Sequence, residues 1–501
     1  STSSASPEST VSGTTGQPFV VLEDLLPATT YYVWVRAECG DDDYSSWGAA
    51  VSFTTGQLRY VREGASGTGD SWAEASGDIQ AMIDASGEGS EVWVAAGTYL
   101  PSATSFRLKN GVTVYGGFPE GGGDWNDRDW LESRATLNGH PDYSIVYNSS
   151  VDRTAVLDGF VIRGGDSDRG GGIRNWNASP TLRNLEIRDN KATWGGGLFN
   201  SDGSAPWLVN VAILHNESEY YGGGMYNGDT GSPIILTNVV IANNQTGNGY
   251  HGGAMQNEDA ILTLTNVTIA GNTSENSAVY NENSTVAVRN TIAWGNSNGY
   301  TPINGIRPGG AGNVLTVDYS LVEGLTDADG NGNLDGDTDP GFLRAGAGDY
   351  RLHETSPVID AGNNGYFALG AEPDLSGIDT DVIGNPRFYE GGTVDLGAYE
   401  FSDNQPPLPA TVRYVKTVAD GGAEDADGLS WETASSDLQA MIDVSMEGDE
   451  VWVAAGDYES PWYGFNMKEG VAIYGGFPAN GGDESDRDWR EDEKILSGFS
   501  E

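Results

Sequence analysis

The chain has 501 residues, including 72 glycines, and a formal net charge of −48. Its length suits two or three domains. The negative charge argues against nucleic acid or an anionic membrane surface as a partner, since both need a positive face, and an acidic polysaccharide would be repelled unless a divalent cation bridged it. The single cysteine, Cys39, excludes a disulfide within the chain, and no apolar run is long enough to predict membrane insertion in this segment.

Residues 1–56 are typical of the end of a β-sandwich. Pro27 marks a turn, the aromatic and β-branched run over residues 31–37 predicts a strand, and residues 53–55 predict a closing strand. This pattern resembles the corner and following strand of a fibronectin type III domain, in which Tyr31 would be the corner tyrosine. We therefore interpret this segment as the C-terminal part of such a domain. An unrelated hairpin is the alternative.

From residue 57 onward the chain is rich in short predicted strands closed by glycine turns. Residues 59–61, 91–97 and 112–118 are predicted strands. Asp78 precedes the amphipathic run 79–83, and its carboxylate can accept hydrogen bonds from the free N–H groups of a short helix. A helix before the first coils is predicted to cap a solenoid, whose open end would otherwise expose strand edges and core.

The centre of the chain repeats one glycine-rich motif. The copies read Arg-Gly-Gly-Gly-Ile-Arg-Asn, Trp-Gly-Gly-Gly-Leu-Phe-Asn, Tyr-Gly-Gly-Gly-Met-Tyr-Asn and His-Gly-Gly-Ala-Met-Gln-Asn, at residues 169–175, 194–200, 221–227 and 251–257, with a worn copy at 275–281. Glycine supplies a positive φ or close backbone approach at a recurring corner. Strand formers lie between the copies without a helical stripe, so each period is predicted to consist of short strands and turns.

Asparagines mark the same period. One set is Asn184, Asn210, Asn238, Asn266 and Asn290, each followed six residues later by another asparagine, and a second set closes the glycine motif at Asn200, Asn227, Asn257 and Asn281. From Asn184 to Asn290 there are 106 residues in four steps, so the period is near 26. A fixed period of this length indicates a solenoid. Coils of strands stacked about 4.8 Å apart form a parallel β-helix, in which these asparagines are expected to form structural amide ladders.

The residue before each glycine pair forms one predicted column of mixed side chains. Its members are Arg169, Trp194, Tyr221 and His251, and Tyr220 lies beside them. A ridge of Trp194, Tyr220, Tyr221 and His251 along the solenoid could stack on sugar rings. Alternatively, the side chains of a turn ladder simply pack on one another, and this second interpretation is favoured.

An acidic loop after the repeats alternates oxygen-bearing side chains with small residues. These are Asp327, Asp329, Asn331, Asn333, Asp335 and Asp337. Ligands at every second position, with glycine for a sharp turn, are typical of a calcium loop. The loop departs from the EF-hand pattern, because its twelfth position is Thr338 instead of Glu and no flanking helices are predicted. Calcium is therefore an expected cofactor, with a solvated acidic loop between coils as the alternative.

Catalytic residues are not predicted. A polysaccharide lyase on such a solenoid needs a basic residue beside calcium carboxylates, and a hydrolase needs two or three carboxylates a few Å apart. The acidic residues of the coils do not share one repeat position: Glu186, Asp189, Glu217, Glu219, Glu258 and Asp259. The histidines show no fixed spacing to serine or aspartate: His140, His215, His251 and His353.

The block that opens the solenoid returns near the end of the chain. Residues 413–415 repeat 59–61, and residues 451–456 repeat 92–97. The predicted organisation is therefore a solenoid, a Pro-rich and semi-rigid linker, and the N-terminal part of a second solenoid module. The corresponding ranges are 57–401, 402–411 and 412–501.

The end of the first solenoid carries family motifs. They are Asp-Pro-Gly-Phe, Ser-Pro-Val-Ile-Asp-Ala-Gly and Val-Asp-Leu-Gly-Ala-Tyr-Glu at residues 339–342, 356–362 and 394–400. This tail resembles that of secreted bacterial right-handed parallel β-helix proteins of the choice-of-anchor type, common in Bacteroidetes. The glycine and asparagine marks are similar to the repeats of chlamydial polymorphic outer-membrane adhesins. The resemblance implies a right-handed β-helix, an extracellular or bacterial cell-surface location and export by type nine (type IX) secretion, but says little about chemistry.

Together these features predict a structural or adhesive tandem-repeat protein that presents rigid rods for contact with surfaces, cells or glycans. Its expected partners are glycans, cell-surface proteins and other copies of the module in the same chain. Two alternatives stay open: a carbohydrate-active enzyme on the same solenoid, and a passive stalk. The duplication favours an array, since repetition multiplies weak contacts.

Overall fold

The computed structural model describes residues 29–36, 38–40, 43–102, 104–139, 142–299, 304–308, 312–325, 330–403, 411–423, 426, 428–445, 449–459, 464–468, 470–483, 486–488, 490 and 494–497. The chain separates into two compact units, Ser1–Ser402 and Asp403–Glu501. No helix in the described part of the chain is both long and apolar enough to cross a membrane.

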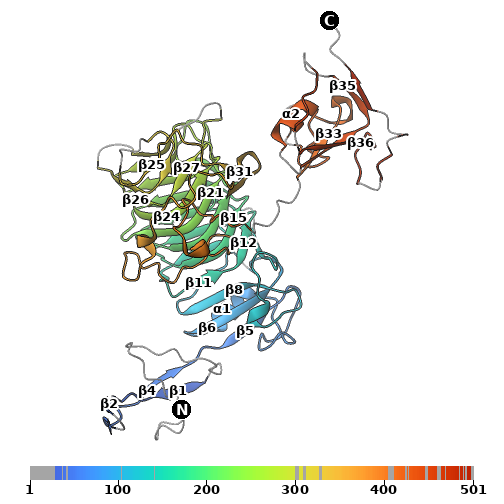
Figure 1. Ribbon diagram of the computed structural model, residues 1–501. Coiled ribbons are helices and arrows are strands. Elements are labelled where there is room, and N and C mark those ends of the chain that lie inside the picture. The colour runs from blue at the N-terminus through green and yellow to red at the C-terminus, as the bar shows by residue number, and fades with distance from the viewer. Residues whose placement is uncertain are drawn as a thin grey trace. The chain divides into compact units, whose positions relative to one another are not determined.

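The first unit is built around a parallel β-helix, which confirms the predicted all-β fold class (Figure 1). Its longest sheet runs along the whole stack through β5 (Leu58–Val61), β6 (Ser90–Ala95), β8 (Val112–Phe118), β11 (Val156–Asp158), β15 (Thr181–Arg188), β18 (Trp207–Leu214), β21 (Ile234–Ala242), β24 (Ile261–Ala270), β26 (Thr285–Arg289) and β29 (Val314–Asp318). Shorter strands extend this sheet: β7 (Gly97–Tyr99), β9 (Ala135–Asn138), β12 (Phe160–Arg163), β27 (Ile292–Trp294) and β30 (Leu321–Val322).

Two further sheets complete the coils. A seven-stranded sheet contains β10 (Val146–Ser149), β14 (Ile173–Trp176), β17 (Leu198–Ser201), β20 (Met225–Gly228), β23 (Met255–Glu258), β25 (Ser277–Glu282) and β28 (Asn304–Pro308). A four-stranded sheet contains β13 (Asp166–Arg169), β16 (Lys191–Trp194), β19 (Glu217–Tyr221) and β22 (Gln245–Thr246). All pairs in these two sheets are parallel and join one coil to the next.

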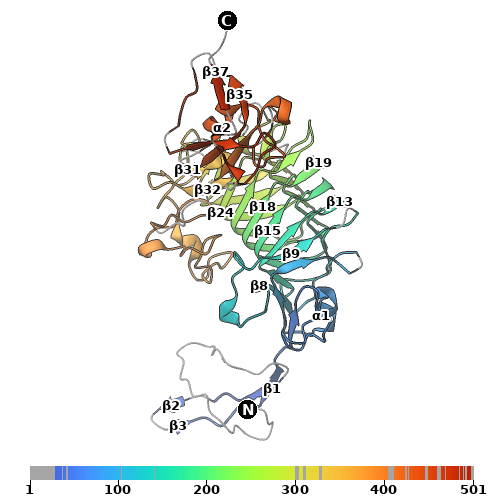
Figure 2. The ribbon, with the colours of Figure 1, turned by 90° about the vertical axis from the view of Figure 1, so that its right-hand side faces the viewer.

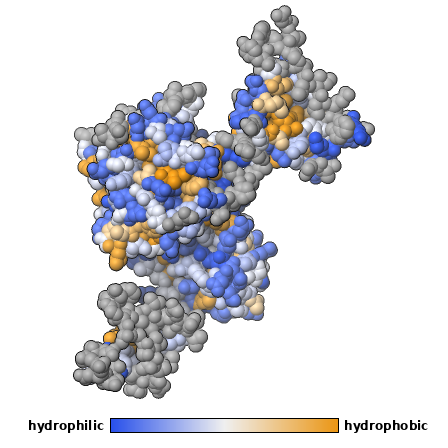
Figure 3. Space-filling model, in the orientation of Figure 1, coloured by the Kyte–Doolittle hydropathy of each residue, from blue (hydrophilic) through white to orange (hydrophobic). Residues whose placement is uncertain are grey.

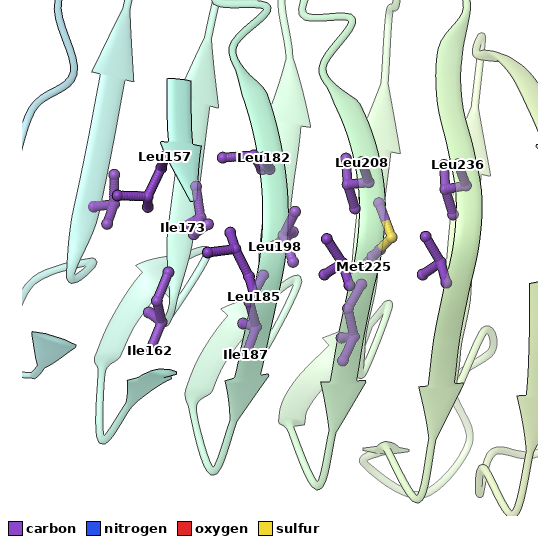
Figure 4. Close-up of a cluster of buried hydrophobic side chains, with 14 of the residues drawn as sticks. Leu157, Ile162, Ile173, Leu182, Leu185, Ile187, Leu198, Leu208, Met225 and Leu236 are labelled. Carbon is purple, nitrogen blue, oxygen red and sulfur yellow. The ribbon is translucent and has the colours of Figure 1, made fainter. Parts of the chain in front are cut away.

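The interior is filled by columns of aliphatic side chains. In the long sheet Leu157, Leu182, Leu208 and Leu236 are register partners on successive strands, and each is at most 2% exposed (Figure 4). Full burial of one such side chain stabilises the fold by about 1.5–3 kcal/mol, so the columns provide a large share of the driving force for stacking.

Two amide ladders run through the interior. The first joins Asn148, Asn175, Asn200, Asn227, Asn257 and Asn281, each donating from Nδ2 to the next Oδ1 at 2.8–3.0 Å. The second joins Asn190, Asn216, Asn244, Asn272 and Asn296 in the same way. In the second ladder each Nδ2 also donates to a backbone carbonyl of the preceding coil. These buried amides are therefore satisfied only when neighbouring coils are present.

A third asparagine column marks a bend in the long strands. Asn184, Asn210, Asn238, Asn266 and Asn290 all have left-handed backbone conformation, with φ between 47° and 54°. Asparagine tolerates this region better than most residues. Side-chain hydrogen bonds join Asn184 to Asn210, Asn210 to Asn238 and Asn266 to Asn290.

The predicted cap begins the stack. Helix α1 (Ile79–Ala85) starts after Asp78, whose carboxylate accepts from the Ala81 N–H at 3.0 Å. Its buried side chains Ile79, Met82 and Ile83 belong to the same core as the first coils. Asp78 therefore caps the helix, and the helix covers apolar positions at the end of the solenoid.

The tail of the first unit differs from expectation, because residues 342–402 do not continue the stack of parallel strands. It contains an antiparallel pair, β31 (Phe342–Arg344) and β32 (Asp349–Leu352). The remainder packs across the outside of the long sheet, and Figure 2 shows it on one side of the stack with β13 and β19 on the other. Tyr350, Val382 and Ala398 pack on Val240 and Ala270 of the sheet. β21 and β24 are consequently buried on both faces over most of their length.

A buried polar cluster fixes the tail to the bend column. Arg387 is fully buried, pairs with Glu400 at 2.8 Å and donates to Asn238 Oδ1 at 2.6 Å. It thus occupies the gap in the third ladder between Asn238 and Asn266. Asn266 Nδ2 instead donates to the backbone carbonyls of Asp395 and Gly397. The tail is thus hydrogen-bonded to side-chain amides of the third asparagine column, whose other members bond to the asparagine of a neighbouring coil.

Burial perturbs the acids of this cluster. It raises the pKa of Asp395 to about 6, although backbone N–H groups of Phe401 and Asp360 donate to its carboxylate. Burial also raises the pKa of Glu400, against the opposing effect of Arg387, and raises the pKa of Asp381. The folded state therefore holds these protons to higher pH than the unfolded chain does.

The N-terminal residues of the first unit form two small antiparallel pairs. β1 (Thr30–Val33) pairs with β4 (Val51–Thr54), and β2 (Glu38–Gly40) pairs with β3 (Asp43–Tyr44). Tyr31 stacks on Phe53 with ring centroids 5.9 Å apart. Residues 1–28 lie outside the described part, and the fibronectin type III interpretation stays a prediction.

The second unit repeats the opening of the first. A three-stranded parallel sheet contains β33 (Val412–Val415), β34 (Glu450–Ala454) and β36 (Ala472–Phe477), beside helix α2 (Leu438–Val444) and the pair β35 (Gly456–Glu459) and β37 (Lys494–Ser497). Asp437 caps α2 as Asp78 caps α1. The Trp452–Phe477 stack matches the Trp93–Phe118 stack, each with centroids 4.5 Å apart. Figure 3 shows hydrophobic residues gathered on one face of this unit.

Five single turns of 3₁₀ helix complete the described elements. They are η1 (Trp125–Asp127), η2 (Ala345–Ala347), η3 (Asn364–Phe367), η4 (Tyr389–Gly391) and η5 (Val418–Asp420).

Replacing Asn244 by alanine should strongly destabilise the first unit. The variant leaves the N–H of Asn216, the carbonyl of Ile213 and Oδ1 of Asn272 without their side-chain partner. Each unsatisfied buried group costs about 1–3 kcal/mol, so a loss of roughly 3 kcal/mol in unfolding free energy is expected in chemical denaturation. The exposed Asn248→Ala is the control and should change stability by less than about 0.5 kcal/mol.

Stability should fall as pH rises from about 4 to about 6. In this window the unfolded Asp395 carboxyl releases its proton while the folded one, with a pKa of about 6, retains it. The folded state then binds more protons than the unfolded chain does. The contribution of Asp395 to the free energy of unfolding therefore declines by on the order of 2–3 kcal/mol across the window. Denaturation curves at stepped pH test this. Asp395→Asn should flatten the slope, and an equally steep slope in that variant would exclude Asp395 as its source.

Candidate functional site

The predicted ridge lies at a corner of the solenoid, where the four-stranded sheet ends. Arg169 is the register partner of Trp194, and Trp194 is the partner of Tyr221. The N–H of Gly222 reaches the carbonyl of His251 in the next coil, so the column continues. Its rings contact one another, with centroid distances of 5.4 Å for Trp194–Tyr221 and 6.3 Å for Tyr221–His251.

Ring packing and partial exposure occur together along this ridge. Tyr220 contacts Trp194 and Tyr250, at 5.9 and 4.9 Å between ring centroids. Trp194, Tyr220, Tyr221 and His251 are all half-buried. The side chains therefore support one another as the turn-ladder interpretation expects, while a continuous aromatic surface stays accessible.

The outer face of the seven-stranded sheet continues this surface. Because side chains alternate along a β-strand, one residue in two points inward. Leu198 and Asn200 therefore lie in the core, with Phe199 on the outer face between them. Phe199 is the register partner of Tyr226, and the two rings stack with centroids 5.0 Å apart and planes 7° apart. Trp194 meets Tyr226 edge-on at 5.3 Å.

A pocket opens on this face because two small residues interrupt an outward row of larger ones. Along the register the row reads Trp176, Ser201, then Gly228 and Glu258 on the next two strands. Ser201 leaves space that Trp176 fills one coil earlier, whereas the Tyr226 ring lies over Gly228, where an added Cβ would come within 3.0 Å of it. The resulting pocket has a volume of about 380 Å³ and is lined by Arg169, Trp194, Phe199, Ser201, Asp202, Tyr226, Gly228, Asp229, Glu258 and Asp259.

The hydroxyl of Ser201 is an unusual feature of the pocket lining. Ser201 is only 8% exposed, and its Oγ is buried without a hydrogen-bond partner among the described residues. A buried polar atom of this kind costs free energy unless something satisfies it. Because Ser201 lines the pocket, a bound molecule is well placed to do so.

Acidic side chains line one side of the pocket. Asp202, Asp229 and Asp259 each lie two residues after a ladder asparagine and share a left-handed corner, with φ of 55°, 49° and 50°. They are exposed and form no side-chain hydrogen bond or ion pair within the described part of the chain. Of the acids considered as catalytic candidates, Glu258 and Asp259 line this pocket, whereas Glu186, Asp189, Glu217 and Glu219 do not.

The remaining charged groups have distinct environments. Glu258 accepts a hydrogen bond from the Tyr226 hydroxyl at 2.6 Å. Burial, reinforced by this hydrogen bond, raises the pKa of Tyr226, which keeps the hydroxyl protonated as a donor. The guanidinium of Arg169 lies over the Phe199 ring at 5.4 Å. The pocket thus combines aromatic walls, acceptor oxygens and one cation.

A second hollow lies where the long sheet meets the four-stranded sheet. It has a volume of about 310 Å³ and is lined by Asp189, Asn190, Lys191, His215, Glu217, Asn243 and Gln245. Lys191 and Glu217 pair at 2.7 Å across it, and the hydrogen bond to Glu217 raises the pKa of Lys191. Its lining contains no Phe, Tyr or Trp, so it offers less apolar surface to a ligand than the first pocket.

The predicted calcium loop is only partly described. Asp327 and Asp329 lie outside the described residues. Asn331 donates to Asp318 Oδ1 at 2.9 Å, and Asn333 bonds the last coil through both ends of its amide, at Val317 and Ser320. In the described part, Asp335 accepts from the N–H of Asp337 at 3.1 Å, and no group of three or more His, Cys, Asp or Glu residues lies close enough to hold a metal ion. Calcium in this loop stays a prediction.

The chain is similar to solved structures in its fold. No family model matches the chain, and no curated protein matches it. A solved structure, the crystal structure of pectate lyase Pel9A, is similar with a TM-score of 0.41 and 15% sequence identity, over 70% of this chain and 97% of that one. No functional residue is carried over from it.

Calcium binding to the acidic loop should raise the thermal stability of the first unit. A ligand held only by the folded state stabilises it by about 2.7 kcal/mol at a hundred times its dissociation constant. Melting curves with added calcium and with excess chelator should therefore separate, and Asp335→Asn should reduce the separation. Coincident curves for the unmodified protein would remove calcium as a structural cofactor of this loop.

Proposed function

We propose that the β-helix module is a non-catalytic glycan-binding rod of an extracellular, cell-surface array. The observation that carries this proposal is the pocket beside the aromatic ridge, where Phe199, Tyr226 and Trp194 flank the unpartnered hydroxyl of Ser201. Ligand sites in proteins combine apolar and aromatic walls with a few placed polar groups, and this pocket has that composition.

Carbohydrate is the ligand class that suits both the aromatic and the acidic parts of the pocket lining. A sugar ring presents C–H groups on one face, which pack on aromatic rings, and hydroxyls around its edge. Hydroxyls donate to carboxylates and accept from donors. Asp202 and Asp229 supply acceptors at the rim, and Arg169 supplies donors at the other side. The half-buried Trp194 supplies the accessible apolar surface, and Phe199 and Tyr226, only 4% and 8% exposed, support it from below.

The scaffold supports binding without rearrangement. Phe199, Ser201 and Tyr226 project from strands whose neighbours Leu198, Asn200 and Met225 are fully buried in the core. Side chains fixed in this way lose little freedom when a ligand binds, which favours affinity. Several such modules in one array would add avidity to weak individual contacts.

A second candidate function is polysaccharide cleavage. The observation that favours it is the column of carboxylates on successive coils, because retaining glycosidases use two carboxyl groups about 5–5.5 Å apart. In those enzymes the two groups flank the scissile bond. Asp202, Asp229 and Asp259 instead share one corner of successive coils, which favours binding over cleavage.

Filling the pocket should abolish glycan retention. Ser201→Trp places in the outward row the side chain that Trp176 already places there one coil earlier, so the change suits the backbone. Affinity electrophoresis on immobilised polysaccharides should show retention of the full chain and at least a tenfold loss in this variant. Trp176→Ser is the control for a change in the same row outside the pocket lining, and it should retain binding.

Product analysis in the same experiment separates the candidate functions. Unchanged chain length after long incubation supports the binding module. Shortened chains, or unsaturated ends that absorb ultraviolet light, would establish the enzyme instead. Absence of retention on neutral, basic and acidic polysaccharides would reject both and favour the passive stalk.

A further inference from the structure

The charge of the pocket restricts which glycans it can accept. Four carboxylates line it, from Asp202, Asp229, Glu258 and Asp259, against the single guanidinium of Arg169. The chain as a whole carries a formal net charge of −48. A uronic acid residue would therefore meet both a local and a long-range repulsion, whereas a cation would be attracted.

Three of these carboxylates are available to a ligand. Asp202, Asp229 and Asp259 have no ion-pair or side-chain hydrogen-bond partner among the described residues, and they stand on successive coils on one side of the pocket. Glu258 differs, since it already accepts from the Tyr226 hydroxyl. The three carboxylates repel one another, so a bound positive charge would relieve their interaction.

An independent feature points to a ligand at the same place. The Oγ of Ser201 is buried, lines the pocket and lacks a partner among the described residues. Acidic residues alone would be a solvated surface. A buried hydroxyl beside them, walled by the stacked rings of Phe199 and Tyr226, defines a place where a small polar group would be enclosed.

We propose that this pocket selects amino sugars with a free ammonium group, over neutral, N-acetylated and acidic sugars. This inference rests on the proposed glycan-binding function. The ammonium group has three donors, which the carboxylates of Asp202 and Asp229 and the hydroxyl of Ser201 can accept. Charge-assisted hydrogen bonds are stronger than neutral ones, so the ammonium group gains more from these acceptors than a neutral hydroxyl does.

N-acetylation supplies the sharpest discrimination. It removes the positive charge and two of the three donors while it leaves the sugar ring intact. The aromatic and hydroxyl contacts of the proposed function would persist, so an N-acetylated sugar should bind weakly. The difference between the two sugars therefore measures the charge selection by itself.

Calorimetric titration of the full chain with short oligosaccharides of one length tests the proposal. The probes are oligomers of glucosamine, N-acetylglucosamine and galacturonate at fixed ionic strength. Glucosamine oligomers should bind at least tenfold more tightly than N-acetylglucosamine oligomers, and oligogalacturonate should not bind. Raising the pH until the amine is neutral should remove the preference.

Three variants test whether the preference for glucosamine arises in this pocket. Asp229→Asn should reduce the affinity for glucosamine oligomers severalfold more than the affinity for N-acetylglucosamine oligomers, because only the first loses a charge-assisted contact. Glu120→Gln, an equal charge change at an exposed turn outside the pocket, should leave the preference intact. Ser201→Trp should abolish binding of both sugars. Persistent glucosamine binding in that variant would show general attraction of a polycation to an acidic protein and would overturn the proposal.

The other outcomes are also distinct. Equal affinity for glucosamine and N-acetylglucosamine oligomers would overturn the charge selection and leave the glycan-binding function standing. Binding of oligogalacturonate only with added calcium, lost in chelator, would replace the amino sugar with a cation-bridged acidic glycan. Failure of every sugar to bind would overturn the proposed function and this inference together.

Discussion

The structure depends on one constraint, which is that equal positions of successive coils stack at the strand spacing of about 4.8 Å. Each buried amide of the two interior ladders, except the last of each, donates to the asparagine of the next coil. Asparagine is costly in a core unless both ends of its amide are satisfied. A coil without its neighbour would expose these groups together with an aliphatic column. Hydrogen bonding of the ladder amides and burial of the aliphatic columns therefore both favour the same register between coils.

The same constraint shapes the outer surface. Outward side chains form rows, and a row of similar residues gives a flat face, so a pocket requires a row that changes size. Ser201 and Gly228 make that change between Trp176 and Glu258. The corner that must adopt a positive φ accepts asparagine or aspartate, and in three successive coils it holds aspartate. A backbone requirement thereby places three carboxylates beside the pocket.

The sequence predicts what repeats and misses what does not. The two asparagine sets and the Asp78 cap follow from local spacing, and the structure shows the corresponding hydrogen bonds except between Asn238 and Asn266, where Arg387 and the tail intervene. The tail could not be placed in this way, because Arg387 meets Asn238 across 149 residues with no shared period. The pocket was missed for a different reason. An Asn-x-Asp spacing at Asn200, Asn227 and Asn257 is present in the sequence. It indicates a ligand site only once the structure shows that the aspartates form no side-chain hydrogen bond or ion pair among the described residues.

The tail explains why the pocket lies where it does. A parallel β-helix offers several outer faces, and here residues 342–402 cover the long sheet. The ion pair of Arg387 and Glu400 is buried in that contact, and breaking such a pair is costly, so this face stays covered. Phe199 and Tyr226 lie instead on the seven-stranded sheet, beside the half-exposed ridge of the four-stranded sheet. The outer face of the long sheet is thus covered by the tail, which stabilises the unit. The pocket and the ridge lie on faces of the solenoid that the tail does not cover.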